Sequence, residues 1–267
     1  MRAKSISALS RITFLEGLRR HSVHGLLALG VLAEIGGLFF MDFIGRDVGR
    51  ACSDYSFSVM WIIGALFLFF HTVQVFAWDE GNKSIYSLLA RPITRAEYVV
   101  GTTLGLCALL LLLQLSMGLI SYVALIWIKS TLDAVYFPLL SVSSFILSWL
   151  GLVTMQLVIL SMIVLLSSAL RGSFLVMLSS ISYYLICSGL PVIRETLFLQ
   201  QGMENLLLTL LTAIFPNFER LDFKDLVAST NPIIDLSMII PQFALSYSYI
   251  ALCITLACII YQKRDLY

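Results

Sequence analysis

Charge is scarce in this chain, and its scarcity excludes most classes of soluble protein. Asp, Glu, Lys and Arg make up only 12% of the 267 residues, whereas a soluble domain carries about a quarter. Hydrophobic residues reach 59%, above the roughly one half that is typical of soluble domains. The net charge is +1 and no basic tract occurs, so the composition indicates a membrane protein and no nucleic-acid partner.

Catalytic and metal-binding motifs are also missing. The chain has three histidines but no His-Glu-x-x-His zinc helix, no Gly-x-Ser-x-Gly elbow and no Gly-x-x-x-x-Gly-Lys-[Ser/Thr] phosphate loop. None of the five cysteines forms a Cys-x-x-Cys pair, which disfavours a disulfide framework or a zinc site. We therefore expect a protein that is not an enzyme, needs no cofactor or metal of its own and does not hydrolyse ATP by itself.

The chain is rich in apolar runs of about 20 residues, each long enough to cross a hydrocarbon core of about 30 Å. These runs predict an all-α polytopic membrane protein with a single transmembrane domain over residues 1–267. A charged loop with Arg50 and Asp54 is expected after the first span, and Gly101 and Gly105 have the GxxxG spacing of packed helices. The six spans are expected at 24–41, 57–77, 99–128, 137–170, 174–193 and 239–261.

The N-terminal segment, residues 1–22, is basic and amphipathic. Apolar residues recur there at every third position, namely at Ile6, Leu9, Ile12, Leu15 and Leu18. This pattern predicts a helix in the interface of the anionic cytoplasmic leaflet, with a frayed basic tail as the alternative. No short apolar stretch with a cleavage site is present, so we expect no removable signal peptide.

The region between the last two spans, residues 194–238, contains one apolar run at 206–215. This run is too short to span the membrane as a helix, so we expect a re-entrant or outer-surface helix. The alternative is a seventh span at 197–215. The polar stretch that follows, 217–225, would close a translocation path, bind a periplasmic partner or serve as a solvated connector.

The distribution of positive charge predicts the orientation of the chain. Six spans put both termini on one side of the membrane. With the termini inside, the inner segments hold 11 of the 17 Lys and Arg residues and the outer segments hold 6. The positive-inside rule therefore predicts an inner-membrane protein with cytoplasmic termini, a cytoplasmic segment 79–98 and an extracytoplasmic segment 194–238.

A strongly polar interruption, residues 78–98, separates the second and third spans. Ile85, Leu88 and Leu89 recur there at i, i+3 and i+4, which places them on one face of a helix. Pro92 ends that helix and biases Arg91 away from the helical region. The apolar face suits docking onto a partner, and anchoring of the loop to lipid headgroups is the alternative.

A longer motif contains this face: Glu80, Lys83-Ser84-Ile85, Leu88-Leu89-Ala90-Arg91-Pro92-Ile93-Thr94-Arg95, Glu97-Tyr98 and Gly101. It resembles the loop between spans 2 and 3 of ABC-2 type transporter permeases. In that family a Gly-Thr pair commonly stands at the place of Lys83-Ser84, and a Lys often stands at that of Thr102. Further likeness lies in Thr13-Phe14-x-Glu16-x-x-Arg19, Phe215-Pro216-Asn217-Phe218-Glu219 and Lys263-Arg264-Asp265-Leu266.

The resemblance implies an ATP-driven exporter with two six-span subunits, a homodimer or pseudo-dimer. Each subunit would sit on an ATP-binding cassette (ABC) ATPase that binds ATP and Mg²⁺. Segment 79–98 would be the coupling helix, with its apolar face buried in the ATPase and its charged residues at the rim of the contact. The implied coupling residues are Glu80, Ile85, Leu88, Leu89, Arg91, Pro92 and Arg95.

Five polar residues fall within the apolar spans and are expected to be buried, namely Glu34, His71, Gln74, Gln114 and Gln156. A charge near the bilayer centre costs several kcal/mol, so Glu34 should face protein or a wet cavity. One hypothesis is a substrate path at the dimer interface, for which the candidates are Glu34, His71 and Gln74. The other is hydrogen bonding between helices.

Two further functions remain compatible with the sequence. An ion-coupled secondary transporter or channel would use Glu34 and His71 as ion sites, although no inverted repeat is visible. A non-transporting scaffold would help to assemble a periplasmic maturation or secretion system.

Overall fold

A computed structural model of the chain describes residues 2–40, 48–76, 93–131, 140–197, 215–228 and 236–264. Every regular element within these residues is a helix, and six of the helices are long and apolar enough to cross a membrane. The chain is therefore an all-α, multi-pass membrane protein, which confirms the fold class predicted from its composition.

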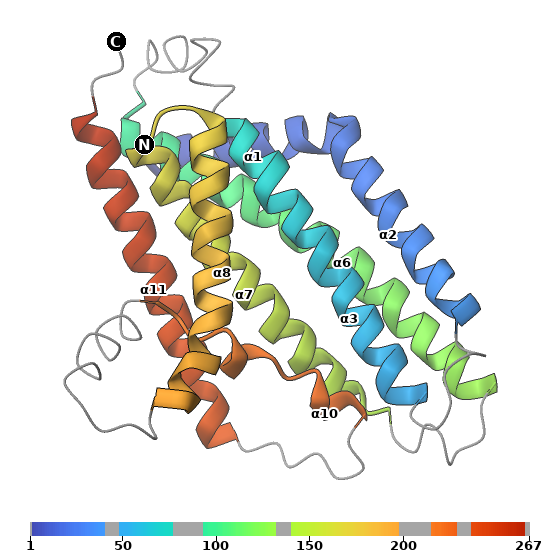
Figure 1. Ribbon diagram of the computed structural model, residues 1–267. Helices are drawn as coiled ribbons and strands as arrows, with labels where there is room; N and C mark the ends of the chain where they lie inside the picture. Colours follow the sequence, from blue (N-terminus) through green and yellow to red (C-terminus); the bar gives the residue numbers. More distant parts are fainter. Residues whose placement is uncertain are drawn as a thin grey trace.

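The spanning helices follow the predicted order: α2 (His21–Phe40), α3 (Val48–Leu66), α6 (Arg95–Thr131), α7 (Val142–Ala169), α8 (Ser173–Leu197) and α11 (Leu236–Lys263). Helix α3 continues through a π-helical stretch, η2 (Phe67–Thr72), to Phe76. The shorter elements are α1 (Arg2–Arg19), η3 (Glu219–Leu221) and α10 (Asp225–Ala228). Helix α1 and the end of α11 lie at one end of the bundle, the terminal end, and α10 lies at the opposite, distal end (Figure 1).

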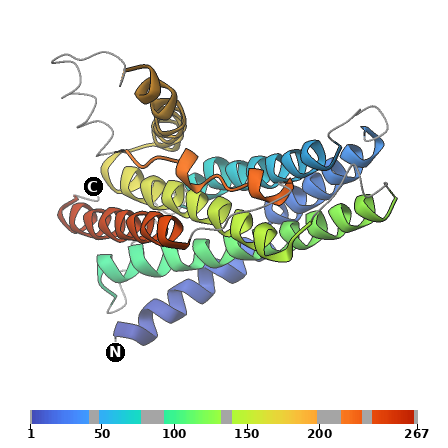
Figure 2. The same ribbon diagram turned by 90° about the horizontal axis from the view of Figure 1, so that it is seen from below.

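Helices α3 and α7 form the centre of the bundle. The membrane-length windows of α7 and α3 are 67% and 61% buried, against 17% for α2 and for α11. In the view from below, α7 lies between α3 and α11 (Figure 2). The large apolar side chains exposed on the outer helices, such as Phe39, Phe174 and Leu245, are available to lipid or to a second subunit.

The start of the second span differs from its prediction. Helix α3 begins at Val48 rather than at residue 57, so Arg50 and Asp54 are helical and do not lie in a loop. Arg50 pairs at 2.8 Å with Asp225 of α10, and the Ser53 hydroxyl donates to the Arg50 carbonyl. The helix thus extends beyond its apolar part into residues that make polar contacts.

The predicted N-terminal helix is present as α1, and it is seated on the start of α6. A Cβ atom at Gly101 would lie 2.6 Å from Cβ of Leu9, and one at Gly105 would lie 2.7 Å from Cβ of Thr13. Helix α1 thus packs against the GxxxG pair of α6. Leu9 is buried in this contact, whereas Ile12 is 53% exposed, so the predicted apolar stripe divides between two faces of the helix.

The segment after α8 is described only in part. Helix α8 runs to Leu197, past the predicted end of its span at residue 193. The predicted short helix at 206–215 lies outside the described residues except for Phe215. Residues 215–228 form an irregular strip at the distal end that contains η3 and α10, and we call it the distal segment.

Candidate functional site

Most of the predicted coupling residues lie outside the described part of the chain. Arg95 is the one predicted coupling residue within a described helix, α6. The six outside the described residues are Glu80, Ile85, Leu88, Leu89, Arg91 and Pro92. The candidate site is therefore built from the described residues on either side of positions 77–92. These residues are Phe76 at the end of α3 and Thr94 at the start of α6.

An aromatic cluster joins the end of α3 to the start of α6. Phe76 contacts Tyr98 edge-on, with ring centroids 6.5 Å apart. Tyr98 also stacks on Tyr261 of α11, at 5.8 Å. All three side chains are less than 9% exposed, so α3, α6 and α11 meet in a packed contact at the terminal end.

A capping box fixes the start of α6. The Glu97 backbone N–H donates to Thr94 Oγ1 at 3.3 Å, and the Thr94 N–H donates to Glu97 Oε2 at 2.8 Å. This reciprocal pair satisfies two donors that have no partner within the helix. The sequence Thr94-Arg95-Ala96-Glu97 carries the signature of this cap, so the start of α6 could have been found from the sequence alone.

Two arginines tie three helix ends to one another. Arg95 Nη1 donates to the backbone carbonyls of Gln262, at 3.2 Å, and Arg264, at 2.6 Å, where α11 ends. Arg264 in turn donates to the carbonyls of Ser167, at 2.8 Å, and Leu170, at 3.1 Å, where α7 ends. Carbonyls at a helix C-terminus lack partners within the helix and favour a cation. We call Arg95 and Arg264 the arginine latch.

The hydrogen-bond partners of Arg95 in the latch were not predicted from the sequence. The resemblance implies a charged contact with an ATPase, whereas the described contacts of the Arg95 guanidinium are to the chain's own α11. No model of a known protein family matches the chain, and no curated protein matches it either. The case for a function therefore rests on the residues themselves.

Glu34 lies among three helices with both carboxylate oxygens hydrogen-bonded. Ser121 of α6 donates to Oε1 at 2.6 Å, and Ser56 of α3 donates to Oε2 at 3.1 Å. The Glu34 side chain is 3% exposed. Both side-chain oxygens are thus hydrogen-bonded inside protein, as expected for a buried carboxyl group in a membrane protein. These contacts support the hypothesis of interhelical hydrogen bonding.

His71 occupies a separate position in the π-helical stretch η2. Its ring stacks on Phe67 with centroids 5.0 Å apart, and Nδ1 lies 3.2 Å from Ser22 Oγ. Nε2 is buried and has no hydrogen-bond partner among the described residues. Ser56, which binds Glu34, lies 15 residues before His71 in the same helical rod, a rise of about 22 Å. Glu34 and His71 therefore do not form one site.

The remaining glutamines divide between the surface and the core. Gln74 is exposed, so the expectation that it is buried was wrong. Gln114 is buried, and its Nε2 donates to the Met60 carbonyl at 3.0 Å. Neither polar atom of the buried Gln156 amide has a partner among the described residues. A Cβ atom at Gly64 would lie 2.5 Å from Gln114 Nε2 and would also clash with the Gln156 amide.

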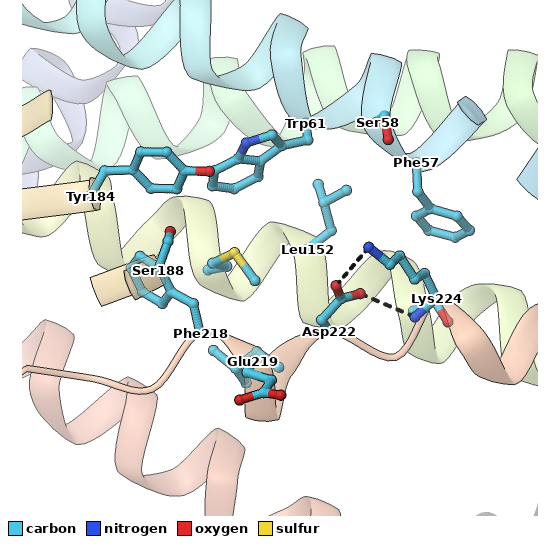
Figure 3. Close-up of a pocket in the computed structure, with 13 residues that line it drawn as sticks. Phe57, Ser58, Trp61, Leu152, Tyr184, Ser188, Phe218, Glu219, Asp222 and Lys224 are labelled. Atoms are coloured by element: carbon cyan, nitrogen blue, oxygen red, sulfur yellow. Dashed lines mark hydrogen bonds and ion pairs between the residues drawn. The ribbon is translucent and has the colours of Figure 1, made fainter. Parts of the chain in front are cut away.

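A cavity of about 330 Å³ lies near the distal end, and the sequence did not predict it. Its walls come from α3, α7 and α8, and the distal segment covers it (Figure 3). Ser148 of α7 donates to the Phe223 carbonyl at 2.6 Å, which holds the distal segment against α7. The signal available in the sequence was the recurrence of aromatic residues in α3 and in Phe215–Phe218, but their meeting depends on the fold.

An ion pair lies at the edge of this cavity. Lys224 Nζ is 3.1 Å from Asp222 Oδ2. Partial burial disfavours the charged lysine, but the hydrogen bond and charge of Asp222, helped by two further carboxylates, together raise the Lys224 pKa. The lysine therefore stays protonated, and its charge is balanced by a neighbour. Among the described residues no cluster of His, Cys, Asp and Glu side chains suits a metal ion.

Proposed function

We propose that this chain is the membrane-spanning subunit of an ABC-2 type exporter, driven by a separate ATPase subunit. Two such subunits, each with its ATPase, form the transporter in the inner membrane, with the termini and segment 79–98 in the cytoplasm. The resemblance of segment 80–101 supports this proposal, as does the excess of Lys and Arg in the inner segments.

The observation that carries the proposal is the arrangement at the terminal end of the bundle. A segment that transmits a conformational change from an ATPase must be in contact with the spans that move. Phe76, which precedes segment 79–98 in the chain, and Tyr98, at its end, belong to one cluster with Tyr261. The arginine latch continues this connection from α6 to α11 and α7. Movement of the segment would therefore reach four spans, through the buried aromatic cluster and the partly buried arginine latch.

The decisive experiment alters the apolar face of segment 79–98. The double variant Leu88→Asp, Leu89→Asp places two charges on the face that would be buried in the ATPase, where unpaired charge is costly. Ser87→Asp is the matched control, because residue 87 lies on the opposite side of a helix that presents Ile85, Leu88 and Leu89. The tagged chain is purified from its native membrane, and co-purification of an ABC ATPase and vanadate-sensitive ATP hydrolysis are measured.

We expect the wild type and Ser87→Asp to retain the ATPase and the double variant to lose it. A wild-type chain that purifies without an ATPase would refute the proposal. A double variant that keeps both the ATPase and its activity would refute the docking face. An associated ATPase with no transport of any compound would instead support the scaffold, and flux that follows an ion gradient without ATP would support the secondary transporter.

A further inference from the structure

The cavity near the distal end has an apolar interior and a polar mouth. Its volume of about 330 Å³ falls at the small end of the range for ligand pockets, roughly 300–1,000 Å³. Trp61, Leu152 and Tyr184 are buried or partly buried members of its lining (Figure 3). The more exposed charged residues of the lining, Glu219, Asp222 and Lys224, form its polar mouth. Such a site fits a small molecule with an apolar body and one polar group.

Aromatic rings from three separate elements line this cavity. Trp61 of α3 and Tyr184 of α8 have ring centroids 5.2 Å apart, and Tyr184 and Phe218 have centroids 6.3 Å apart. Trp61 and Tyr184 are only partly buried, so the cluster is not closed against a ligand. The face of an aromatic ring carries negative potential and attracts a cation, most strongly in the case of Trp.

The charges at the mouth also favour a positively charged ligand. The lining includes two carboxylates and one ammonium group. The ammonium of Lys224 is paired with Asp222 at 3.1 Å, so these two charges balance. The exposed carboxylate of Glu219 has no ion pair or side-chain hydrogen bond with a described residue, and Figure 3 draws it apart from that pair. The three charged residues of the lining therefore carry one net negative charge.

Together, these features distinguish between classes of ligand. An anion would meet aromatic faces and an excess carboxylate, both of which repel it. A neutral hydrocarbon would gain nothing from Glu219. We propose that this cavity binds a small organic cation with an apolar body, such as an aromatic quaternary ammonium compound. That this cation is the exported cargo rests on the proposed function, whereas the binding itself does not.

The test measures binding by the full chain in lipid nanodiscs without any ATPase. Radiolabelled benzyltrimethylammonium is the probe, equilibrium dialysis is the readout, and benzenesulfonate is the anionic counterpart. Saturable binding of the ammonium compound and none of the sulfonate are expected. Glu219→Gln and Trp61→Leu should each weaken binding about fivefold or more. Arg220→Gln, in the same 3-10 turn but outside the cavity lining, should not weaken it.

Equal binding of the two probes would overturn the proposal, as would wild-type affinity in both cavity variants. Glu219 is exposed, so its variant should keep the fold even where a change at Trp61 does not. Saturable binding that depends on Glu219 and Trp61, in a chain that does not associate with an ATPase, would support the cavity proposal and refute the proposed function. If the chain is an ATPase-driven exporter but does not bind the ammonium probe, only the cavity proposal is refuted.

Discussion

Gly64 is the position at which one added methyl group should matter most. It faces the amides of Gln114 and Gln156, which fill the space that a side chain would need. Both glutamines are fully buried, so neither can swing out to make room. Gly64→Ala should therefore destabilise the protein by about 1–3 kcal/mol, the usual cost of overpacking a core. The thermal unfolding midpoint in detergent, compared with that of the wild type, measures this.

A glycine in open space gives the matched control for this substitution. A Cβ atom at Gly36 of α2 would meet no atom within 4 Å. Gly36→Ala should leave the stability unchanged or raise it by up to about 1 kcal/mol, because alanine is the better helix former. Equal midpoints for the two variants would show that the amides of Gln114 and Gln156 do not pack against Gly64.

Glu34 permits a test between its two hypothetical roles. Glu34→Ala removes the acceptor for the hydroxyls of Ser56 and Ser121 and should destabilise the protein by about 1–3 kcal/mol. Glu34→Gln keeps a polar group of the same shape, so a purely structural residue should tolerate it. We expect the Gln variant to keep most of the unfolding midpoint and of the transport rate. A stable Gln variant that has lost transport would instead establish a substrate-path role for the charge.

At the scale of helices, the arginine latch couples three elements that are distant in sequence. Arg264 donates to carbonyls at the end of α7, and its own carbonyl accepts from Arg95 of α6. Arg264→Ala should lower the free energy of unfolding by about 1–3 kcal/mol, since charged hydrogen bonds to otherwise unpaired carbonyls are lost. If the latch transmits movement, this variant should also retain its ATPase yet transport more slowly.

The neighbouring residue supplies the control for the latch. Lys263 is exposed at the same helix end, and no hydrogen bond or ion pair joins its side chain to the described residues of α7. Lys263→Ala should change the stability by no more than about 0.5 kcal/mol. The unfolding midpoint and the ratio of transport to ATP hydrolysis are measured for both variants. A latch variant with a normal ratio would show that movement reaches α7 by another route.

The helices also show why the spans could be predicted and their details could not. A long apolar run has few alternatives in a membrane, so α6 and α7 lie close to their predicted limits. The polar start of α3 was missed because Arg50 is compensated by Asp225, 175 residues further along the chain. The distal cavity was missed for the same reason, since its walls come from four parts of the chain.

For the whole molecule, the two ends of the bundle have different characters. The terminal end is closed by the aromatic cluster and the arginine latch, whereas the distal end carries the cavity and its charged mouth. One continuous helical rod joins them, because Trp61 lines the cavity and Phe76 belongs to the cluster. Between these residues lies η2, a π-helical stretch of the kind that often occurs at functional positions.

The orientation of the whole chain can be tested with reporters at its two ends. Helix α1 and the end of α11 lie at the same end of the bundle (Figure 1), so both termini should face the same side of the membrane. The charge distribution, 11 Lys and Arg residues in the inner segments against 6 in the outer ones, predicts the cytoplasmic side. Green fluorescent protein fused to either terminus should therefore fluoresce, and alkaline phosphatase at the same positions should be inactive.

The opposite pattern would have a consequence beyond orientation. The described end of segment 79–98 lies at the terminal end, where Thr94 and Glu97 cap α6 and Tyr98 packs on Tyr261. We therefore expect the segment on the same side as the termini. Active phosphatase at both termini would place this segment outside the cell membrane, beyond the reach of a cytoplasmic ATPase, and the distal cavity would open to the cytoplasm. The same pair of fusions thus tests the docking side on which the proposed function depends.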